Sequence, residues 1–251
     1  MNYVDNLKQR LKENALKICA KYPNEFSGKE FSSAFVWNNT EMNFHKNTME
    51  NICKNTDWIE RTKKKHPQVE NTFEMQSSNS SDALLMNIFC FPKILKWKGV
   101  IDLLSIDIEH GIEFGKKFYE EGQYMAEVDM KIGNSIFEAK LTETDFEEET
   151  FEKIDNYKDF KLVFDKNLLP KSQENYLNYQ LIRNILVAYY NNFSFTLLCD
   201  ETRIDLIKSL FEVTAAIKID NLRRRVSFVT WQEIINVCGK ELKDYITEKY
   251  F

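Results

Sequence analysis

Apolar residues near the amino end recur at intervals of three and four positions, which is the spacing of one face of an α-helix. This pattern predicts an amphipathic helix that ends before Pro23. Farther along, a serine-rich break precedes a continuous apolar run. Because serine caps helices well, we expect a second, mostly buried helix from about Asp82 to Phe89. The apolar positions of the first helix are Val4, Leu7, Leu11, Ala15 and Ile18, and the serines are Ser77, Ser78, Ser80 and Ser81.

The carboxyl half of the chain alternates between helix-like and strand-like patterns. The helix-like stretches are 176–190, 201–216 and 231–246, and the strand-like stretches are 193–200 and 224–231. Between this region and the centre of the chain, residues 143–152 are acidic and either begin a helix or cover a loop. Alternation of this kind is typical of an α/β or α+β layer structure.

A tight turn is predicted at Gly133 and Asn134, between two stretches that alternate like strands. If Ile132 pairs with Ser135, counting outward places Asp129 opposite Glu138. Successive side chains of a strand point to opposite faces, so the hairpin separates apolar from charged side chains. One face carries Val128, Met130, Ile132, Phe137, Ala139 and Leu141, and the other carries Glu127, Asp129, Glu138 and Lys140.

The charged face crowds carboxylates together. Directly opposed like charges, with Cβ atoms only about 5 Å apart, destabilise a hairpin, so Asp129 and Glu138 need a neutralising partner. Mg²⁺ binds through one or two carboxylates and keeps several waters. Lys140 would then orient or deprotonate a metal-bound water and stabilise charge on a phosphate.

The alternative is an exposed charged face on which Lys140 simply balances an acid. Tripeptides of the form acid-x-lysine are common, and they also occur at 129–131, 159–161 and 241–243. The tripeptide 138–140 differs from these because it lies in an apolar strand and faces an acid across a predictable turn.

The composition is that of a folded globular protein, with 251 residues, 34 lysines and arginines, 39 acids and a net charge of -5. This acidity gives no general attraction to nucleic acid. Five cysteines without a C-x-x-C pair indicate neither a disulfide framework nor a zinc knuckle. No apolar run reaches the roughly 18 residues of a membrane helix, and the amino end lacks a signal core. We therefore expect a cytoplasmic protein without a membrane partner.

The length corresponds to between one and two domains at about 150 residues each. No repeat and no low-complexity linker interrupts the chain. We expect residues 1–65 to form a helical extension packed on a core, and residues 66–251 to form that core as one compact unit.

Two polar features of the amino-terminal region could contact DNA. Four asparagines spaced four apart would share one helix face, where asparagine can read adenine, although a solvated helix face is the competing interpretation. A basic run could bind phosphates or serve as a charged connector. The asparagines are Asn43, Asn47, Asn51 and Asn55, and the run is Arg61, Lys63, Lys64, Lys65 and His66.

Asp129, followed by eight residues and then Glu138-Ala139-Lys140 on paired strands, resembles the motif of the PD-(D/E)XK nuclease superfamily, which includes many restriction endonucleases. The first motif has Val128 where the superfamily has proline. The resemblance implies a mixed central sheet, with an antiparallel three-strand meander flanked by helices. Its elements would be a helix around 67–90, strands near 112–120, 123–132 and 135–142, a helix over 176–190 and a strand over 193–199.

The resemblance also implies roles for individual residues. Asp129 and Glu138 would bind Mg²⁺, with Mn²⁺ as a substitute, and Lys140 would be the catalytic lysine. An acid from the first helix would complete the site, and we favour Glu74 over the alternatives Glu70 and Asp82. Gln180 on the second helix would face the site, with a helix-surface hydrogen bond as the competing interpretation.

The function implied is that of a Mg²⁺-dependent, sequence-specific endodeoxyribonuclease of type II restriction-endonuclease kind, which hydrolyses phosphodiesters of double-stranded DNA through metal-activated water. Restriction-modification and a homodimer would follow by analogy. The alternative is a non-catalytic nucleic-acid-binding or interaction module with the same fold. A glycosidase with paired acids leaves the lysine unexplained. The expected phosphate contacts are Lys63, Lys64, Lys65, Arg223, Arg224 and Arg225.

Overall fold

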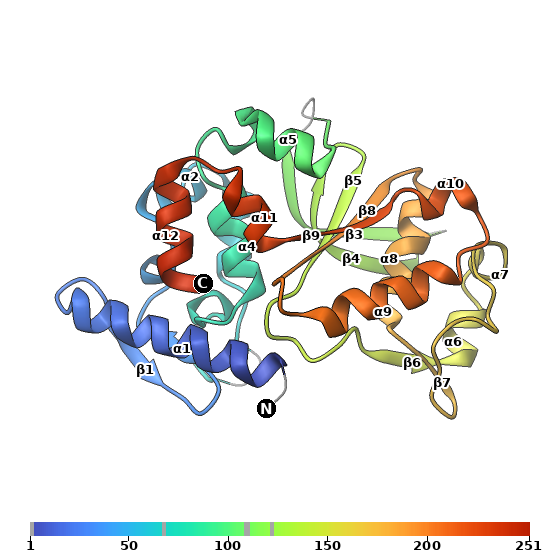
Figure 1. Cartoon of the computed structure of the whole chain (residues 1–251), viewed down its shortest axis with the longest axis horizontal. Helices are drawn as coiled ribbons and strands as arrows, with labels where there is room; N and C mark the ends of the chain where they lie inside the picture. Colours follow the sequence, from blue (N-terminus) through green and yellow to red (C-terminus); the bar gives the residue numbers. More distant parts are fainter. Residues whose placement is uncertain (1–2, 67–68, 108–110, 121–122) are drawn as a thin grey trace. The chain divides into compact units, whose positions relative to one another are not determined.

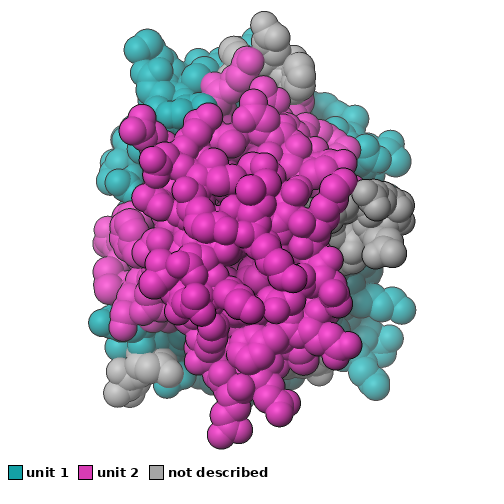
Figure 2. Space-filling view, turned by 90° about the vertical axis from the view of Figure 1, so that its right-hand side faces the viewer, with its two compact units in different colours: residues 1–105, 231–251 teal, residues 106–230 magenta. Residues whose placement is uncertain are grey.

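The computed structural model describes residues 3–66, 69–107, 111–120 and 123–251 (Figure 1). The chain divides into two compact units. Unit 1 comprises residues 1–105 together with 231–251, and unit 2 comprises residues 106–230 (Figure 2). The division after residue 105 differs in position from the boundary expected after residue 65.

Unit 2 is built on a mixed five-stranded sheet with strand order β3-β4-β5-β8-β9. The first three strands form an antiparallel meander, while β8 runs parallel to both β5 and β9. This arrangement confirms the mixed sheet with a three-strand meander. The strands are β3 (Ile112–Glu120), β4 (Gln123–Ile132), β5 (Ser135–Ala139), β8 (Ser194–Cys199) and β9 (Val226–Thr230).

The hairpin of β4 and β5 has the predicted register, with Ile132 opposite Ser135 and Met130 opposite Phe137. Gly133 begins the turn with a φ of 53°, a conformation that costs glycine little because it has no Cβ. Burial alternates along β4 as expected, with Val128, Met130 and Ile132 buried. All of β5 is buried, because β8 extends the sheet beyond it.

Helices and a small second sheet complete unit 2. The central helix α8 (Tyr179–Tyr190) packs on β4 and β8 through residues such as Leu181 and Ile185. It begins later than the predicted residue 176, because Asn178 adopts a left-handed φ of 61° and residues before it form β7. The remaining elements are β6 (Glu148–Thr150), β7 (Asn175–Leu177), α6 (Phe151–Asp155), α7 (Phe160–Val163), α9 (Ile204–Ala215) and α10 (Asp220–Arg223).

Unit 1 is mainly helical and contains both α1 (Tyr3–Lys21) and α12 (Lys240–Tyr250), which pack against each other. A two-stranded sheet of β1 (Gly28–Glu30) and β2 (Phe35–Trp37) was not expected in this region. The other elements are η1 (Glu41–Asn43), α2 (Lys46–Ile52), α3 (Thr56–Thr62), η2 (Glu74–Gln76), α4 (Ser81–Phe89), η3 (Ile94–Lys96), α5 (Lys98–Leu104) and α11 (Trp231–Asn236).

Several helices of unit 1 are shorter than their sequence patterns predict. The helix expected around 67–90 consists of η2 and α4, with Ser80 capping α4 through the amide of Ala83, while residues 67–68 lie outside the described residues. The helix expected from residue 231 is broken near Gly239, whose extended backbone (ψ 149°) separates α11 from α12. In both cases a capping residue starts a new helix.

The expectation that the four asparagines share one helix face was wrong. Asn47 and Asn51 lie on α2, whereas Asn43 ends η1 and Asn55 caps α3. The Asn43 amide donates to the carbonyls of Met75 and Ser77, and the Asn51 amide donates to the carbonyl of Cys90. These amides stabilise the fold of unit 1.

All five cysteines lie among the described residues and have free thiols. Cys90 and Cys199 are buried, whereas Cys53 is exposed. Within the described part of the chain, no helix has the length and apolar character needed to cross a membrane.

Candidate active site

The hairpin of β4 and β5 brings the predicted motif together. Asp129 accepts a 2.8 Å hydrogen bond from the backbone amide of Ala139, the residue between Glu138 and Lys140. The Lys140 ammonium lies 3.0 Å from Glu138 Oε1, and these two side chains are only 7% and 5% exposed. The three motif residues therefore form one cluster, and the alternative of a solvated charged face is wrong for Glu138 and Lys140.

Helix α8 contributes two amides to this cluster. Gln180 Oε1 accepts a 2.6 Å hydrogen bond from the Lys140 ammonium, and Asn184 Nδ2 donates a 2.8 Å hydrogen bond to Glu138 Oε2. Residues four apart on a helix lie on the same face, so one face of α8 contacts both members of the ion pair. Gln180 therefore faces the motif, as the resemblance implies.

The electrostatics of the cluster keep Lys140 charged. Burial acts to lower the pKa of the ammonium, but the carboxylates of Glu138, Glu143 and Asp129 outweigh it and raise the pKa above its ordinary value. The ammonium also lies 5.5 Å from the centre of the Phe146 ring, where a cation is attracted to the aromatic face. Lys140 is thus suited to stabilising negative charge.

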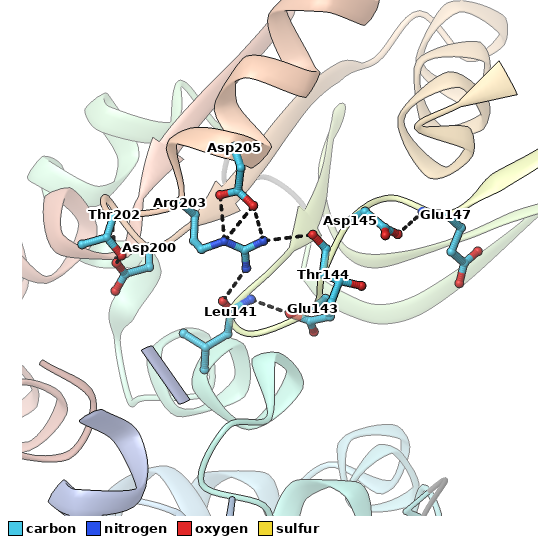
Figure 3. Close-up of polar contacts among 9 residues, drawn as sticks. All are labelled: Leu141, Glu143, Thr144, Asp145, Glu147, Asp200, Thr202, Arg203 and Asp205. Carbon is cyan, nitrogen blue, oxygen red and sulfur yellow. Dashed lines mark hydrogen bonds and ion pairs between the residues drawn. The ribbon is translucent and has the colours of Figure 1, made fainter. Parts of the chain in front are cut away.

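The chain after Lys140 is held by Arg203, as Figure 3 shows. Its guanidinium donates to the carbonyls of Leu141 (2.9 Å) and Thr144 (3.3 Å) and forms a two-point ion pair with Asp205. The Arg203 side chain is fully buried. Because Leu141 directly follows Lys140, this contact fixes the backbone at the end of the motif.

The acids considered for the first helix belong to unit 1, whereas Asp129, Glu138 and Lys140 belong to unit 2. Glu74 forms a 2.8 Å ion pair with Lys64, and the buried Asp82 forms a 2.9 Å ion pair with Arg61. Glu70 is exposed. The contribution of Glu74 to the site stays a prediction.

The two basic stretches differ in how their side chains are used. Lys63 and Lys64 are about half exposed and pair with Glu60 and Glu74, and Lys65 is exposed. In the second stretch, Arg223 donates to the carbonyl of Ile217 and Arg225 donates to that of Phe193, while Arg224 is exposed. Their contact with phosphates stays a prediction.

The donor set fits a hydrated divalent cation. No group of three or more His, Cys, Asp or Glu side chains among the described residues is arranged to hold a metal. Mg²⁺, however, is usually held by one or two carboxylates, and Asp129 and Glu138 supply that number. The Oδ1 atom of Asn184 is buried and has no hydrogen-bond partner within the described chain, which leaves one polar atom of the cluster unsatisfied.

Two residues were not predicted: Asn184, which contacts the motif, and Arg203, which holds the backbone after it. Asn184 lies four residues after Gln180, which is about one helical turn. This spacing could have indicated that Asn184 faces the site together with Gln180. Arg203 follows a buried strand in the sequence, but its partners at 141–144 are about sixty residues away, and no local pattern indicates them.

Comparison with known proteins identifies the family. The sequence matches the family described as "Restriction Endonuclease associating with ARP" over residues 11–251. No curated protein and no solved structure matches the chain. The match spans nearly the whole chain and agrees with the mixed sheet and with the resemblance of the hairpin motif. The chain belongs to the family of restriction endonucleases associating with ARP, and this membership indicates a nuclease-type function.

Proposed function

We propose that the protein is a Mg²⁺-dependent endodeoxyribonuclease that hydrolyses phosphodiester bonds of double-stranded DNA at specific sequences. The observation that carries the proposal is the buried ion pair of Glu138, on β5, and Lys140, which directly follows β5, beside Asp129. Burying two charges is expensive, and a pair of this kind contributes little to stability that apolar side chains would not provide. A catalytic role gives a reason for its presence.

In the proposed reaction each side chain has a separate role. Asp129 and Glu138 would hold the cation, which supplies an activated water nucleophile and stabilises charge on phosphate oxygens. Lys140, held as an ammonium, would stabilise the negative charge that develops on the phosphate. Gln180 would orient the ammonium, since it accepts one of its three N–H bonds.

The proposed partner is double-stranded DNA, with two copies of the chain acting on the two strands. Exposed basic residues such as Lys65 and Arg224 are available for phosphate contacts, which would make binding weaken as salt concentration rises. A homodimer would match the two-fold symmetry of a palindromic site. Sedimentation of the protein with and without such DNA measures this stoichiometry.

The test is cleavage of supercoiled plasmid and unmethylated phage DNA in Mg²⁺, Mn²⁺ or EDTA. We expect discrete, metal-dependent fragments from the wild-type protein. Lys140→Met should reduce the cleavage rate by about 100-fold or more, as expected for removal of a group that stabilises transition-state charge. Asp129→Asn should abolish cleavage in both Mg²⁺ and Mn²⁺.

The matched control is Lys131→Met. Lys131 lies in the same hairpin, is 14% exposed and forms a 2.8 Å ion pair with Glu113, so it resembles Lys140 in setting. We expect it to retain wild-type cleavage. Full activity of a folded Lys140→Met variant would contradict the assignment. A folded wild-type protein that neither cleaves DNA nor binds Mn²⁺ would favour the non-catalytic binding module.

A further inference from the structure

The side chain of Asn184 is completely buried in the middle of α8, and its two polar ends are in different situations. The Nδ2 end donates a 2.8 Å hydrogen bond to Glu138 Oε2. A carboxylate only accepts hydrogen bonds, so it fixes the orientation of this amide. The carbonyl end, Oδ1, is therefore turned away from that carboxylate oxygen.

Oδ1 is the unusual end. It is buried and accepts no hydrogen bond from any described residue. Buried polar atoms in proteins are nearly always hydrogen-bonded to protein or to ordered water. Asn184 Oδ1 can only accept, so its partner must carry a donor hydrogen and must come from outside the described chain.

We propose that Asn184 Oδ1 accepts a hydrogen bond from a water molecule in the hydration shell of the cation held by Asp129 and Glu138. This inference rests on the proposed function, because it requires a cation at these carboxylates. Mg²⁺ and Mn²⁺ fit this role, since Mg²⁺ loses its waters reluctantly and is usually bound with several of them still attached.

Asn184 is thus a positioning residue with two tasks. Its amide N–H orients the Glu138 carboxylate, and its carbonyl oxygen orients one water of the cation. Gln180, one turn earlier on the same face, contacts the other member of the ion pair, Lys140. The helix would then organise both the metal side and the lysine side of the site.

The test is calorimetric titration of the full-length protein with Mn²⁺, in the absence of DNA. We expect Asn184→Leu, which has a similar shape and no polar atoms, to weaken Mn²⁺ binding by about 10- to 100-fold, as is typical when a residue that orients a metal ligand is lost. Asn191→Leu is the control, because Asn191 lies at the carboxyl end of α8 and donates to the carbonyl of Val187. It should bind Mn²⁺ like the wild type.

A second readout separates the two ends of the amide. Water-proton relaxation at saturating Mn²⁺ reports how fast waters exchange from the bound ion. We expect faster exchange in Asn184→Leu than in the wild type. Weaker affinity without a change in water exchange would mean that the amide acts only through Glu138, and this result would overturn the proposal.

Asp129→Asn distinguishes this proposal from the proposed metal site itself. If the wild type binds no Mn²⁺, or if Asp129→Asn binds it normally, the metal site is wrong. If Asp129→Asn loses binding while Asn184→Leu keeps wild-type affinity and exchange, only the role of Asn184 is wrong. Should Asn184→Leu not fold, as judged by circular dichroism, Asn184→Ala removes the same polar atoms without added bulk and decides the question.

Discussion

Gln180 and Lys140 are 40 positions apart in the sequence, and a 2.6 Å hydrogen bond joins their side chains. Lys140 is buried, so its N–H groups have little access to water. Loss of one acceptor from a buried charged donor costs about 1–3 kcal/mol. The contact links the second half of unit 2 to the motif strand.

We therefore expect Gln180→Leu to reduce the single-turnover rate of DNA cleavage by about 10- to 100-fold, which corresponds to the middle of that energy range. Gln180→Glu keeps an acceptor oxygen for the ammonium and should retain most of the rate. Plasmid nicking at saturating Mg²⁺ measures both variants. Equal rates for Gln180→Leu and the wild type would show that Lys140 does not need this acceptor.

Arg203 supports the backbone after the motif, and its removal should cost stability. Arg203→Met leaves the carbonyls of Leu141 and Thr144 without their donor and Asp205 without its ion-pair partner. A buried acceptor left without its donor costs about 1–3 kcal/mol, and the ion pair adds little because the Asp205 side chain is 36% exposed. Urea unfolding should show this loss, whereas the exposed Arg224→Met should change stability by less than about 0.5 kcal/mol. Similar values for both variants would contradict the role of Arg203.

Gly133 makes the tight turn possible. Its φ is 53°, and a Cβ at this position would lie 2.8 Å from the carbonyl oxygen of Asp107. Gly133→Ala should therefore lower stability by about 1–3 kcal/mol, the cost of a strained backbone at a non-glycine residue. Asn134→Ala, at the exposed neighbouring position, is the control for thermal unfolding. A Gly133→Ala protein as stable as this control would show that the turn tolerates a side chain.

Lys249 should make unfolding depend on pH. Burial lowers the pKa of its ammonium well below the ordinary value, and Cys19 opposes this shift. Lys249 Nζ contacts the Met42 carbonyl and the Tyr245 hydroxyl at 3.1 Å each and lies 4.6 Å from the centre of the Trp37 ring. At pH values between the lowered pKa of Lys249 in the folded protein and its pKa of about 10.4 in the unfolded chain, the unfolded chain binds one more proton than the folded protein.

The wild type should consequently gain stability relative to Lys249→Met as the pH rises from the lowered pKa toward about 10.4. Denaturant unfolding at several pH values measures this difference. Lys240→Met, at an exposed lysine of the same helix, is the control for the substitution itself. A constant difference for Lys249→Met would mean that Lys249 remains charged in the folded protein.

Local patterns were enough to predict the hairpin. Strand alternation and the Gly133-Asn134 turn determine the register, and the register determines that Asp129 and Glu138 share a face. The signal is strong because it is contained in about twenty consecutive residues. The motif cluster was predicted for the same reason.

Contacts between distant segments could not be predicted in this way. Asn184 contacts Glu138, 46 positions away in the sequence, and Arg203 contacts Leu141, 62 positions away. No local periodicity of the sequence indicates contacts over such separations. The prediction that the asparagines of unit 1 share one helix face was wrong for a different reason. Local caps at His45 and Asn55 begin separate helices, which interrupt the four-residue periodicity.

Unit 1 is made from two separated stretches of chain, and α1 packs on α12, while unit 2 is continuous. During synthesis, the ribosome completes every residue of unit 2 before it makes α11 and α12. Domains usually fold in the order in which they emerge, yet here α1, which emerges before unit 2, must wait for α12, which emerges after it. Chains truncated after residue 230 and released from the ribosome should therefore protect the hairpin of β4 and β5 from protease while α1 remains susceptible.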